Sequence, residues 1–150
     1  MQRIKQQLYN LCLEYLEKRI QAAREAIEAA QQSANDETKS SSGDKYETGR
    51  AMMQLEVEKN ASQLSESMKL KHTLDQIRID HTAATVQPGS LVVTDREVFF
   101  MAISLGKVKV DDRNYLVISP ASPLGQKLMG LKSGDRTTFK DQPYIIQEII

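Results

Sequence analysis

Residues 1–34 read MQRIKQQLYNLCLEYLEKRIQAAREAIEAAQQSA and contain neither glycine nor proline. Their apolar side chains recur at alternating intervals of three and four positions. One run comprises Ile4, Leu8, Leu11 and Tyr15, and a second comprises Leu13, Leu16, Ile20, Ala23, Ile27, Ala30 and Ala34. Such spacing is typical of a long α-helix that buries one apolar stripe against a partner helix. Because alanines dominate the later part of the stripe, we expect the partner helix to approach closely there.

The partner helix is expected later in the same chain. Residues 33–46, SANDETKSSSGDKY, are polar and rich in serine, which predicts a loop. A second apolar stripe then follows at intervals of three or four, with one slip after its fifth member: Met53, Val57, Ala61, Leu64, Met68, Leu70, Leu74 and Ile77. The sequence therefore predicts an antiparallel coiled-coil hairpin over residues 1–80, with an acidic tip at about residues 35–47. Its second helix would be on the order of 50 Å long.

Beyond residue 80 the pattern changes from helical to β-type. Residues 81–90, HTAATVQPGS, are interpreted as a linker. Short β-branched and aromatic runs predict strands, namely LVVTD (91–95), EVFFMAI (97–103), YLVIS (115–119), TTFK (137–140) and YIIQEII (144–150). A short helix is predicted over residues 122–129, because Ser122 can cap it, Pro123 fits its first position and Gly130 can end it. Residues 91–150 are thus expected to form a small α+β domain with one helix on an antiparallel sheet.

Composition excludes several classes of protein. The chain has 150 residues, with 20 lysines and arginines against 20 acids, so it lacks the positive surplus of a general nucleic-acid coat. No apolar run approaches the roughly 20 residues that cross a bilayer. The N-terminus lacks the apolar region of a signal peptide, so we expect a cytoplasmic protein with no membrane partner. One cysteine and two histidines exclude an internal disulfide and a thiolate or three-histidine metal site, which leaves carboxylate chemistry suited to magnesium.

Carboxylates gather at the predicted tip: Asp36, Glu37, Asp44 and Glu47. Asp44 and Glu47 are three positions apart and would share one face of a helical turn, where two carboxylates can hold one divalent cation. The simpler interpretation is a solvated helix cap, because acids near a helix N-terminus interact favourably with the helix dipole. Spacing alone leaves both interpretations open.

Three stretches resemble one known family. Residues 119–135, SPASPLGQKLMGLKSGD, are similar to a run of Ser-Pro, a short helix, Leu-x-Gly and Lys-x-Gly-Asp. Residues 43–47, GDKYE, are similar to a Gly-Asp-x-x-Glu motif that carries two functional acids, and YIIQEI is similar to the last strand. The family is that of the bacterial transcript-cleavage factors GreA and GreB, which pair an N-terminal antiparallel coiled coil with a C-terminal FKBP-like domain. The resemblance extends over nearly the whole chain.

The resemblance implies an accessory factor without turnover or a cofactor of its own. In this family the coiled coil enters the secondary channel of RNA polymerase. The tip acids help to hold the second magnesium ion at the polymerase active site and to orient the attacking water, and the polymerase then cleaves the 3′ end of backtracked nascent RNA. By resemblance, Asp44 and Glu47 take this role, with Asp36 and Glu37 as further candidates.

The resemblance also implies that Ser122 and Pro123 lie at or near a surface that docks on the rim of the polymerase channel. The same two residues can instead serve only as a helix cap and a first-turn proline. Both interpretations stay open for these two positions.

Other functions also stay open. After Glu47 the chain continues with TGRA, residues 48–51, where the family usually has Asn-Ala-Glu-Tyr. A channel-binding inhibitor or modulator without cleavage stimulation is therefore one alternative, and the additional acids Asp36 and Glu37 favour it. An FKBP-like domain also indicates a peptidyl-prolyl isomerase or chaperone, although this domain has few aromatic residues. A plain dimerising coiled coil would pair helices between chains, whereas we expect a monomer.

Overall fold

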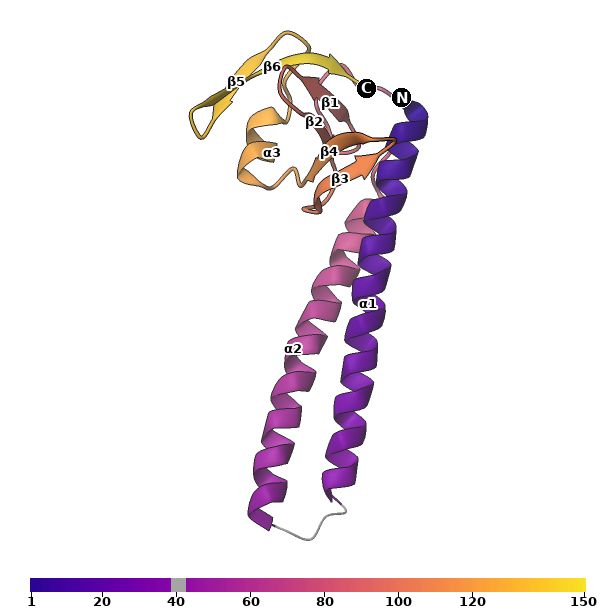
Figure 1. Ribbon diagram of the computed structural model, residues 1–150, viewed down its shortest axis with the longest axis vertical. Helices are drawn as coiled ribbons and strands as arrows, with labels where there is room; N and C mark the ends of the chain where they lie inside the picture. Colours follow the sequence, from indigo (N-terminus) through magenta and orange to yellow (C-terminus); the bar gives the residue numbers. More distant parts are fainter. Residues whose placement is uncertain (39–42) are drawn as a thin grey trace. The chain divides into compact units, whose positions relative to one another are not determined.

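A computed structural model of the protein describes the backbone of residues 1–38 and 43–150 (Figure 1). Side chains are described for the same residues except 34, 37, 38 and 43–47. The chain forms two compact units: unit 1 comprises Met1–Tyr15 and Thr73–Ile150, and unit 2 comprises Leu16–His72. Within the described residues, no helix combines the length and apolarity needed to cross a bilayer. Two long helices thus precede a sheet with one short helix, in the order that the sequence predicts.

Unit 2 consists of two helices that lie side by side and run in opposite directions (Figure 1). They are α1, Gln2–Thr38, and α2, Gly43–Asp75. On α1 the buried residues of this unit are Leu16, Ile20, Ala23 and Ala30, which confirms the second predicted stripe. Across the pair, the Lys71 ammonium lies 3.8 Å from a carboxylate oxygen of Glu17.

The buried positions of α2 differ from the predicted stripe. Asn60 and Ser67 are buried, whereas Ala61 and Met68 are exposed. The buried and half-buried positions include an alternation of four and three residues, Met53, Val57, Asn60, Leu64, Ser67, Lys71 and Leu74, and Leu70 beside it is also half-buried. The predicted stripe is therefore wrong at Ala61 and Met68, because the polar Asn60 and Ser67 are buried in their place. Asn60 tolerates burial since its amide donates to the backbone oxygen of Glu56 at 2.8 Å and to its carboxylate at 3.0 Å.

The helices also extend further than predicted. A loop was expected over residues 33–46, but α1 continues to Thr38 and α2 begins at Gly43. Serine, asparagine and aspartate each cost only a fraction of a kcal/mol in a helix, about 0.7 or less, and each residue added to an existing helix gains a backbone hydrogen bond. Residues 39–42, which fall in the predicted loop, lie outside the described part of the chain.

Unit 1 contains a six-stranded sheet with the order β3-β4-β2-β1-β6-β5. Its strands are β1 Leu91–Thr94, β2 Val98–Met101, β3 Gly106–Val110, β4 Arg113–Ile118, β5 Arg136–Phe139 and β6 Gln142–Ile149. Neighbours are antiparallel except β2 and β4, which run parallel and align Phe99 with Leu116. The sheet is therefore mixed, which corrects the prediction of an antiparallel sheet. After β2 the chain crosses to the edge of the sheet and forms β3 there. It then returns as β4, which lies between β3 and β2.

Strand β3 was not predicted. Its sequence, GKVKV, alternates exposed lysines with more buried valines, which is a strand signal over a short stretch. Asp111 and Asp112 join it to β4, and both have positive φ, at 52° and 63°. Lys140 and Asp141 make the corresponding turn between β5 and β6. Two positive φ values match the twist of a two-residue hairpin, but the glycine that usually marks such a turn is missing from both.

Helix α3, Pro123–Leu128, covers one face of this sheet. The core between them is formed by Val86, Val92, Phe99, Met101, Leu124, Leu128, Tyr144 and Ile146. The Phe99 and Tyr144 rings meet edge to face, with centroids 5.8 Å apart. Val86 lies in the segment 81–90 that was expected as a linker, and its backbone exchanges hydrogen bonds of 2.9 Å with Gly130 and Leu131. This part of the segment therefore belongs to the core of unit 1.

The first turns of α1 join unit 1 through a buried lysine. Lys5 is 1 % exposed, and its ammonium donates to the backbone oxygens of His81 at 3.3 Å and Ile150 at 3.1 Å. Burial lowers the pKa of Lys5, because it removes water from the charged form, and the carboxylate of Asp80 offsets this in part. Lys5 therefore connects three segments that are far apart in the sequence.

Other contacts hold the same part of α1. Arg3 forms an ion pair with Asp111, and the Tyr9 hydroxyl donates to the backbone oxygen of Leu74 at 3.2 Å. Cys12 is fully buried, and burial raises the pKa of its thiol to about 12. The thiol is therefore protonated at neutral pH and acts as a small apolar side chain.

The lowered pKa of Lys5 predicts a pH dependence of stability. Because the folded-state pKa lies below the unfolded value, the unfolded chain binds more protons between these two pKa values, and stability rises with pH across that interval. We therefore expect the free energy of unfolding of wild type to increase relative to Lys5→Met as the pH approaches 10.5. Urea denaturation between pH 7 and 10.5 measures this difference, with Lys109→Met, at an exposed lysine, as the control. A difference that does not change with pH would contradict the prediction.

Candidate functional site

The two acids of the GDKYE segment fall near the N-terminal end of α2. The backbone of Asp44 and Glu47 is helical. Their side chains lie outside the described part of the structure, as does the side chain of Glu37, so the proposed sharing of one cation stays a prediction. Asp36 is described, and its side chain is exposed in the last turn of α1.

Polar side chains line a small hollow between α1 and α2, close in sequence to the segment that joins the two helices. Its volume is about 160 Å³. It is lined by Gln31 and Asn35 of α1 and by Arg50, Met53, Gln54 and Val57 of α2. Three amides and one guanidinium therefore lie within a few helical turns of the acidic segment. Such groups can contact phosphate or base edges of a nucleic acid held nearby.

Within the described side chains, no three His, Cys, Asp or Glu residues come together as a metal site. The side chains of Asp44 and Glu47 are not part of that set. Their carboxylate oxygens are the donors that magnesium takes, and magnesium usually binds one or two protein carboxylates together with water and substrate oxygens. The donor set therefore fits a magnesium ion whose other ligands come from a second molecule.

Residues 119–125 form a capped turn that leads into α3. The Ser122 hydroxyl accepts from the Gly125 N–H at 3.1 Å and donates to the Ser119 carbonyl at 2.6 Å. Pro123 occupies the first helical turn, where its missing N–H is not needed, and it is exposed. The predicted cap and first-turn roles of Ser122 and Pro123 are therefore confirmed. Their docking role stays a prediction.

Gly125 allows the turn to close because it has no side chain. A Cβ at this position would lie 2.0 Å from the Ser119 carbonyl oxygen and 2.8 Å from the Ser122 hydroxyl oxygen. The sequence analysis did not single out Gly125. Its position in the sequence indicates this role, because it lies three residues after the capping Ser122. The N–H at that position donates to the capping hydroxyl, which holds the residue close to the turn.

The surface around α3 presents exposed basic residues and a proline. Pro123 and Lys127 are both exposed and lie one helical turn apart. Lys132 and Arg136 are also exposed, and they follow in the loop after α3 and at the start of β5. The pyrrolidine ring of Pro123 and the nearby basic side chains therefore lie on one exposed surface. Such a surface is complementary to a protein surface that carries acidic residues.

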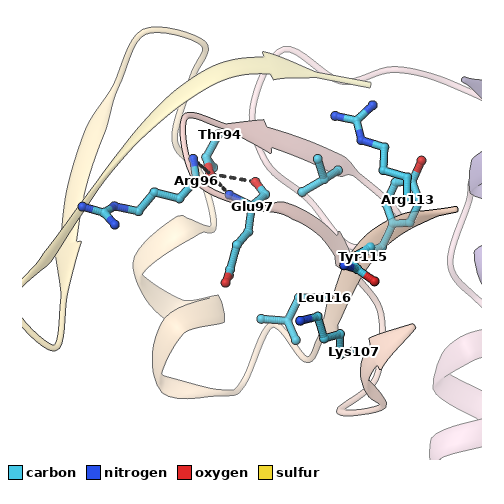
Figure 2. A pocket seen from close by; sticks show the side chains of 9 residues that line it. Thr94, Arg96, Glu97, Lys107, Arg113, Tyr115 and Leu116 are labelled. Carbon is cyan, nitrogen blue, oxygen red and sulfur yellow. Dashed lines mark hydrogen bonds between the residues drawn. The ribbon is translucent and has the colours of Figure 1, made fainter. Parts of the chain in front are cut away.

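A larger hollow on the sheet was not predicted from sequence (Figure 2). Its volume is about 340 Å³. Its lining comes from both faces of the sheet, because Leu116, which also packs against the core under α3, and Tyr115, which alternates with it along β4, both contribute. Glu97, Lys107 and Leu116 project to the side that carries α3, whereas Arg113 projects to the other side (Figure 2). Arg96 extends toward β6 and donates to the Pro143 carbonyl at 2.6 Å, and the Arg113 guanidinium lies 5.9 Å from the centre of the Tyr115 ring.

A comparison of the sequence with protein-family models and with curated proteins finds no match to this chain.

The close approach at Gly125 predicts a large effect of a small substitution. Gly125→Ala forces the Ser119–Ser122 turn apart, and we expect it to lower the free energy of unfolding of unit 1 by about 1–3 kcal/mol, as overpacking typically does. Ser122→Ala, which removes the cap, should cost about 0.5–2 kcal/mol, and Ser122→Thr should restore most of that loss. Urea denaturation followed by circular dichroism measures each value. Lys127→Ala, at an exposed position of the same helix, is the control, and equal stability of Lys127→Ala and Gly125→Ala would contradict the prediction.

Proposed function

We propose that the protein is a GreA/GreB-like transcription elongation factor. In this proposal α1 and α2 form a coiled coil that enters the secondary channel of RNA polymerase and stimulates cleavage of backtracked RNA. The sheet and α3 form an FKBP-like domain that docks on the channel rim. The factor works in the cytoplasm as a monomer and is not itself an enzyme, because the polymerase performs the cleavage.

The observation that carries the proposal is the position of the acidic segment in the first turns of α2, at the connected end of two paired helices. Residues 43–47, GDKYE, directly follow the segment that joins α1 to α2, and the helices on either side pair along a regular heptad seam. A pair of helices is narrow, which suits entry into a narrow channel. The seam has buried alanines, Ala23 and Ala30, which keep the pair slender.

The chemistry of the two carboxylates supports an accessory role. Asp44 and Glu47 would supply two oxygen donors to the second magnesium ion of the polymerase, which stabilises charge on the attacking and leaving oxygens of the RNA phosphate. Two carboxylates are too few to hold magnesium tightly alone, so the site is complete only with the partner's ligands. In this proposal Arg50 lies close enough in sequence to the acids to contact RNA phosphate.

The second support comes from the Ser-Pro run. The cap formed by Ser122 fixes the start of α3 and leaves Pro123 exposed at its first turn. In the proposal this exposed turn contacts the channel rim. A structural role in the cap and a docking role at the surface are compatible, because the hydroxyl points into the turn while the proline ring faces solvent.

An isomerase function has less support from the structure. Phe99 and Tyr144 are buried against each other in the core, and Tyr115 is the one aromatic residue among those that line the hollow of Figure 2. The alternative of a channel-binding modulator requires the same insertion, and the exposed Asp36 favours it as an additional acid near the connection. One experiment separates cleavage from modulation.

The proposal predicts acid-dependent transcript cleavage. Halted, backtracked RNA polymerase from the source organism is incubated with wild type or with Asp44→Asn/Glu47→Gln, and shortened RNA is followed on a gel. We expect wild type to accelerate cleavage and the double variant to lose at least about 100-fold of that acceleration, the scale on which removal of a charge-stabilising group acts. Binding of the variant to the polymerase should be retained.

The matched control is Glu58→Gln/Glu66→Gln, which removes the same charge from exposed positions further along α2. It should cleave like wild type. Slower elongation without cleavage would instead assign the modulator function, and the absence of any binding to the polymerase would overturn the proposal.

A further inference from the structure

Strand β3 lies at one edge of the six-stranded sheet, where it pairs with β4 alone. The turn into β4 has two residues, both with positive φ, so Val110 and Arg113 on either side of it form a hydrogen-bonded pair. Such pairs alternate along an antiparallel ladder, and the backbone N–H and C=O groups of Lys107 and Lys109 therefore point away from β4. Within residues 1–38 and 43–150, no hydrogen bond reaches these four groups. The edge thus presents two donors and two acceptors with the spacing of a β-strand.

A hollow lies beside this edge, between the turn end of β3 and the N-terminal part of α1. Its volume is about 340 Å³, and all of its lining residues belong to unit 1. Leu11 of α1 and Val110 of β3 supply its apolar side chains, and Gln7 and Asn10 of α1 supply two amides. Both amide oxygens already accept hydrogen bonds from side chains one helical turn away, at 3.3 and 3.0 Å. The hollow is therefore placed to receive an apolar side chain from a strand that pairs with β3.

Basic side chains flank the edge on both faces of the sheet. Lys107 projects to the face that carries α3 (Figure 2), and Lys109, two positions further along the strand, lies on the same face. Arg113 of β4 projects to the other face, where its guanidinium lies 5.9 Å from the centre of the Tyr115 ring. A second copy of β3 on this edge would bring lysine opposite lysine, and like charges in that position destabilise a strand pair. The edge therefore suits an acidic strand and not a second copy of this chain.

The acids near the edge leave room for such a strand. Asp111 forms an ion pair with Arg3, and Glu14 also interacts with another residue of the chain. Asp112 is exposed in the turn, beyond Lys109, and Glu97 lies on the far side of β4 (Figure 2). None of these acids lies on β3 between Lys107 and Lys109, where the backbone groups point outward.

We infer that β3 binds an extended segment of a partner protein, in which apolar and acidic residues alternate, as an added antiparallel strand. The acidic residues lie opposite Lys109 and Lys107, and each exchanges two backbone hydrogen bonds with its lysine. The apolar residues lie opposite Val110 and Val108 on the other face, and the first of them enters the hollow beside Leu11. In strand addition the main-chain hydrogen bonds give affinity, and the alternate side chains give specificity. The inference goes beyond the proposed function and does not depend on the polymerase.

The test uses the full chain and the blocked peptide Gly-Leu-Glu-Val-Glu-Gly. Titration followed by ¹H–¹⁵N NMR should give saturable shifts at Leu11, Lys107 and Lys109, with slower solvent exchange of the two lysine amide protons. The peptide Gly-Leu-Val-Glu-Glu-Gly has the same composition and charge without the alternation, and it should bind about tenfold more weakly, the scale of one lost hydrogen bond. Equal binding of the two peptides would overturn the inference, because charge alone would then account for it.

Methylated peptides test the main-chain hydrogen bonds directly. A methyl group on the nitrogen of the first glutamate removes a donor to β3 and should weaken binding about tenfold. A methyl group on the nitrogen of the valine, which points away from β3, is the matched control and should leave binding unchanged. Equal effects of the two methyl groups would contradict strand addition.

Two variants at one position separate the backbone from the charge in the protein. Lys109→Ala removes the ammonium, whereas Lys109→Pro also removes the outward N–H, which the β4 ladder does not use. We expect Lys109→Pro to bind the peptide about tenfold more weakly than Lys109→Ala. Arg136→Glu, at an exposed position of the other edge strand, is the control and should bind like wild type.

Equal binding by the two Lys109 variants, both with the spectra of a folded protein, would overturn the inference. If Lys109→Pro does not fold, the methylated peptides decide the same question with wild type. Sedimentation of the protein alone tests the other occupant. A dimer that protects the Lys107 and Lys109 amide protons without peptide would assign this edge to a second copy and would also overturn the inference.

Discussion

Unit 1 depends on the hydrogen bonds that the buried ammonium of Lys5 donates to two distant backbone segments. A buried charge is stable only where polar groups replace its lost water, and here the backbone oxygens of His81 and Ile150 do so. These two residues lie on either side of the sheet in sequence, so one side chain connects the first turn of α1 to both ends of the sheet-forming segment. Removing Lys5 would take away the ammonium donor to the His81 oxygen and one of two donors to the Ile150 oxygen, which also accepts from the Leu91 N–H at 2.9 Å, and would leave a gap in the packing.

The helical pair depends on a different constraint, which is shape rather than charge. Its seam alternates larger side chains with Ala23 and Ala30 on α1 and with Asn60 and Ser67 on α2. Small residues let two helices approach closely, and the self-contained hydrogen bonds of Asn60 allow a polar group at a buried position. A polar residue in a heptad seam also fixes the register of the pairing. In the proposed function, a slender pair with a defined register would set the depth at which the two carboxylates enter the channel.

Unit 1 presents two separate surfaces that share one strand. The hollow with Glu97 and Lys107 lies at the start of β4, next to Asn114, and the Ser-Pro turn follows the end of β4 at Ser119. Parallel pairing of β2 with β4 makes the hollow, because both strands begin at the same edge of the sheet. The close approach of Gly125 to Ser119 makes the turn.

The sequence by itself determined the two long helices, the stripe of α1, five of the six strands and the capped helix at Ser122, because each depends on local periodicity or on hydrogen bonds between near neighbours. It also located the acidic segment and the Ser-Pro run. Only the tertiary structure decided that Asn60 and Ser67 are buried while Met68 is exposed, that β4 lies parallel to β2, and that Lys5 is buried. It also brought Glu97 and Lys107 to one hollow. These features depend on contacts between residues that are far apart in the chain. At such positions the shape of the neighbouring helix or strand decides which side chain is buried, and the hydrophobicity of the residue alone does not.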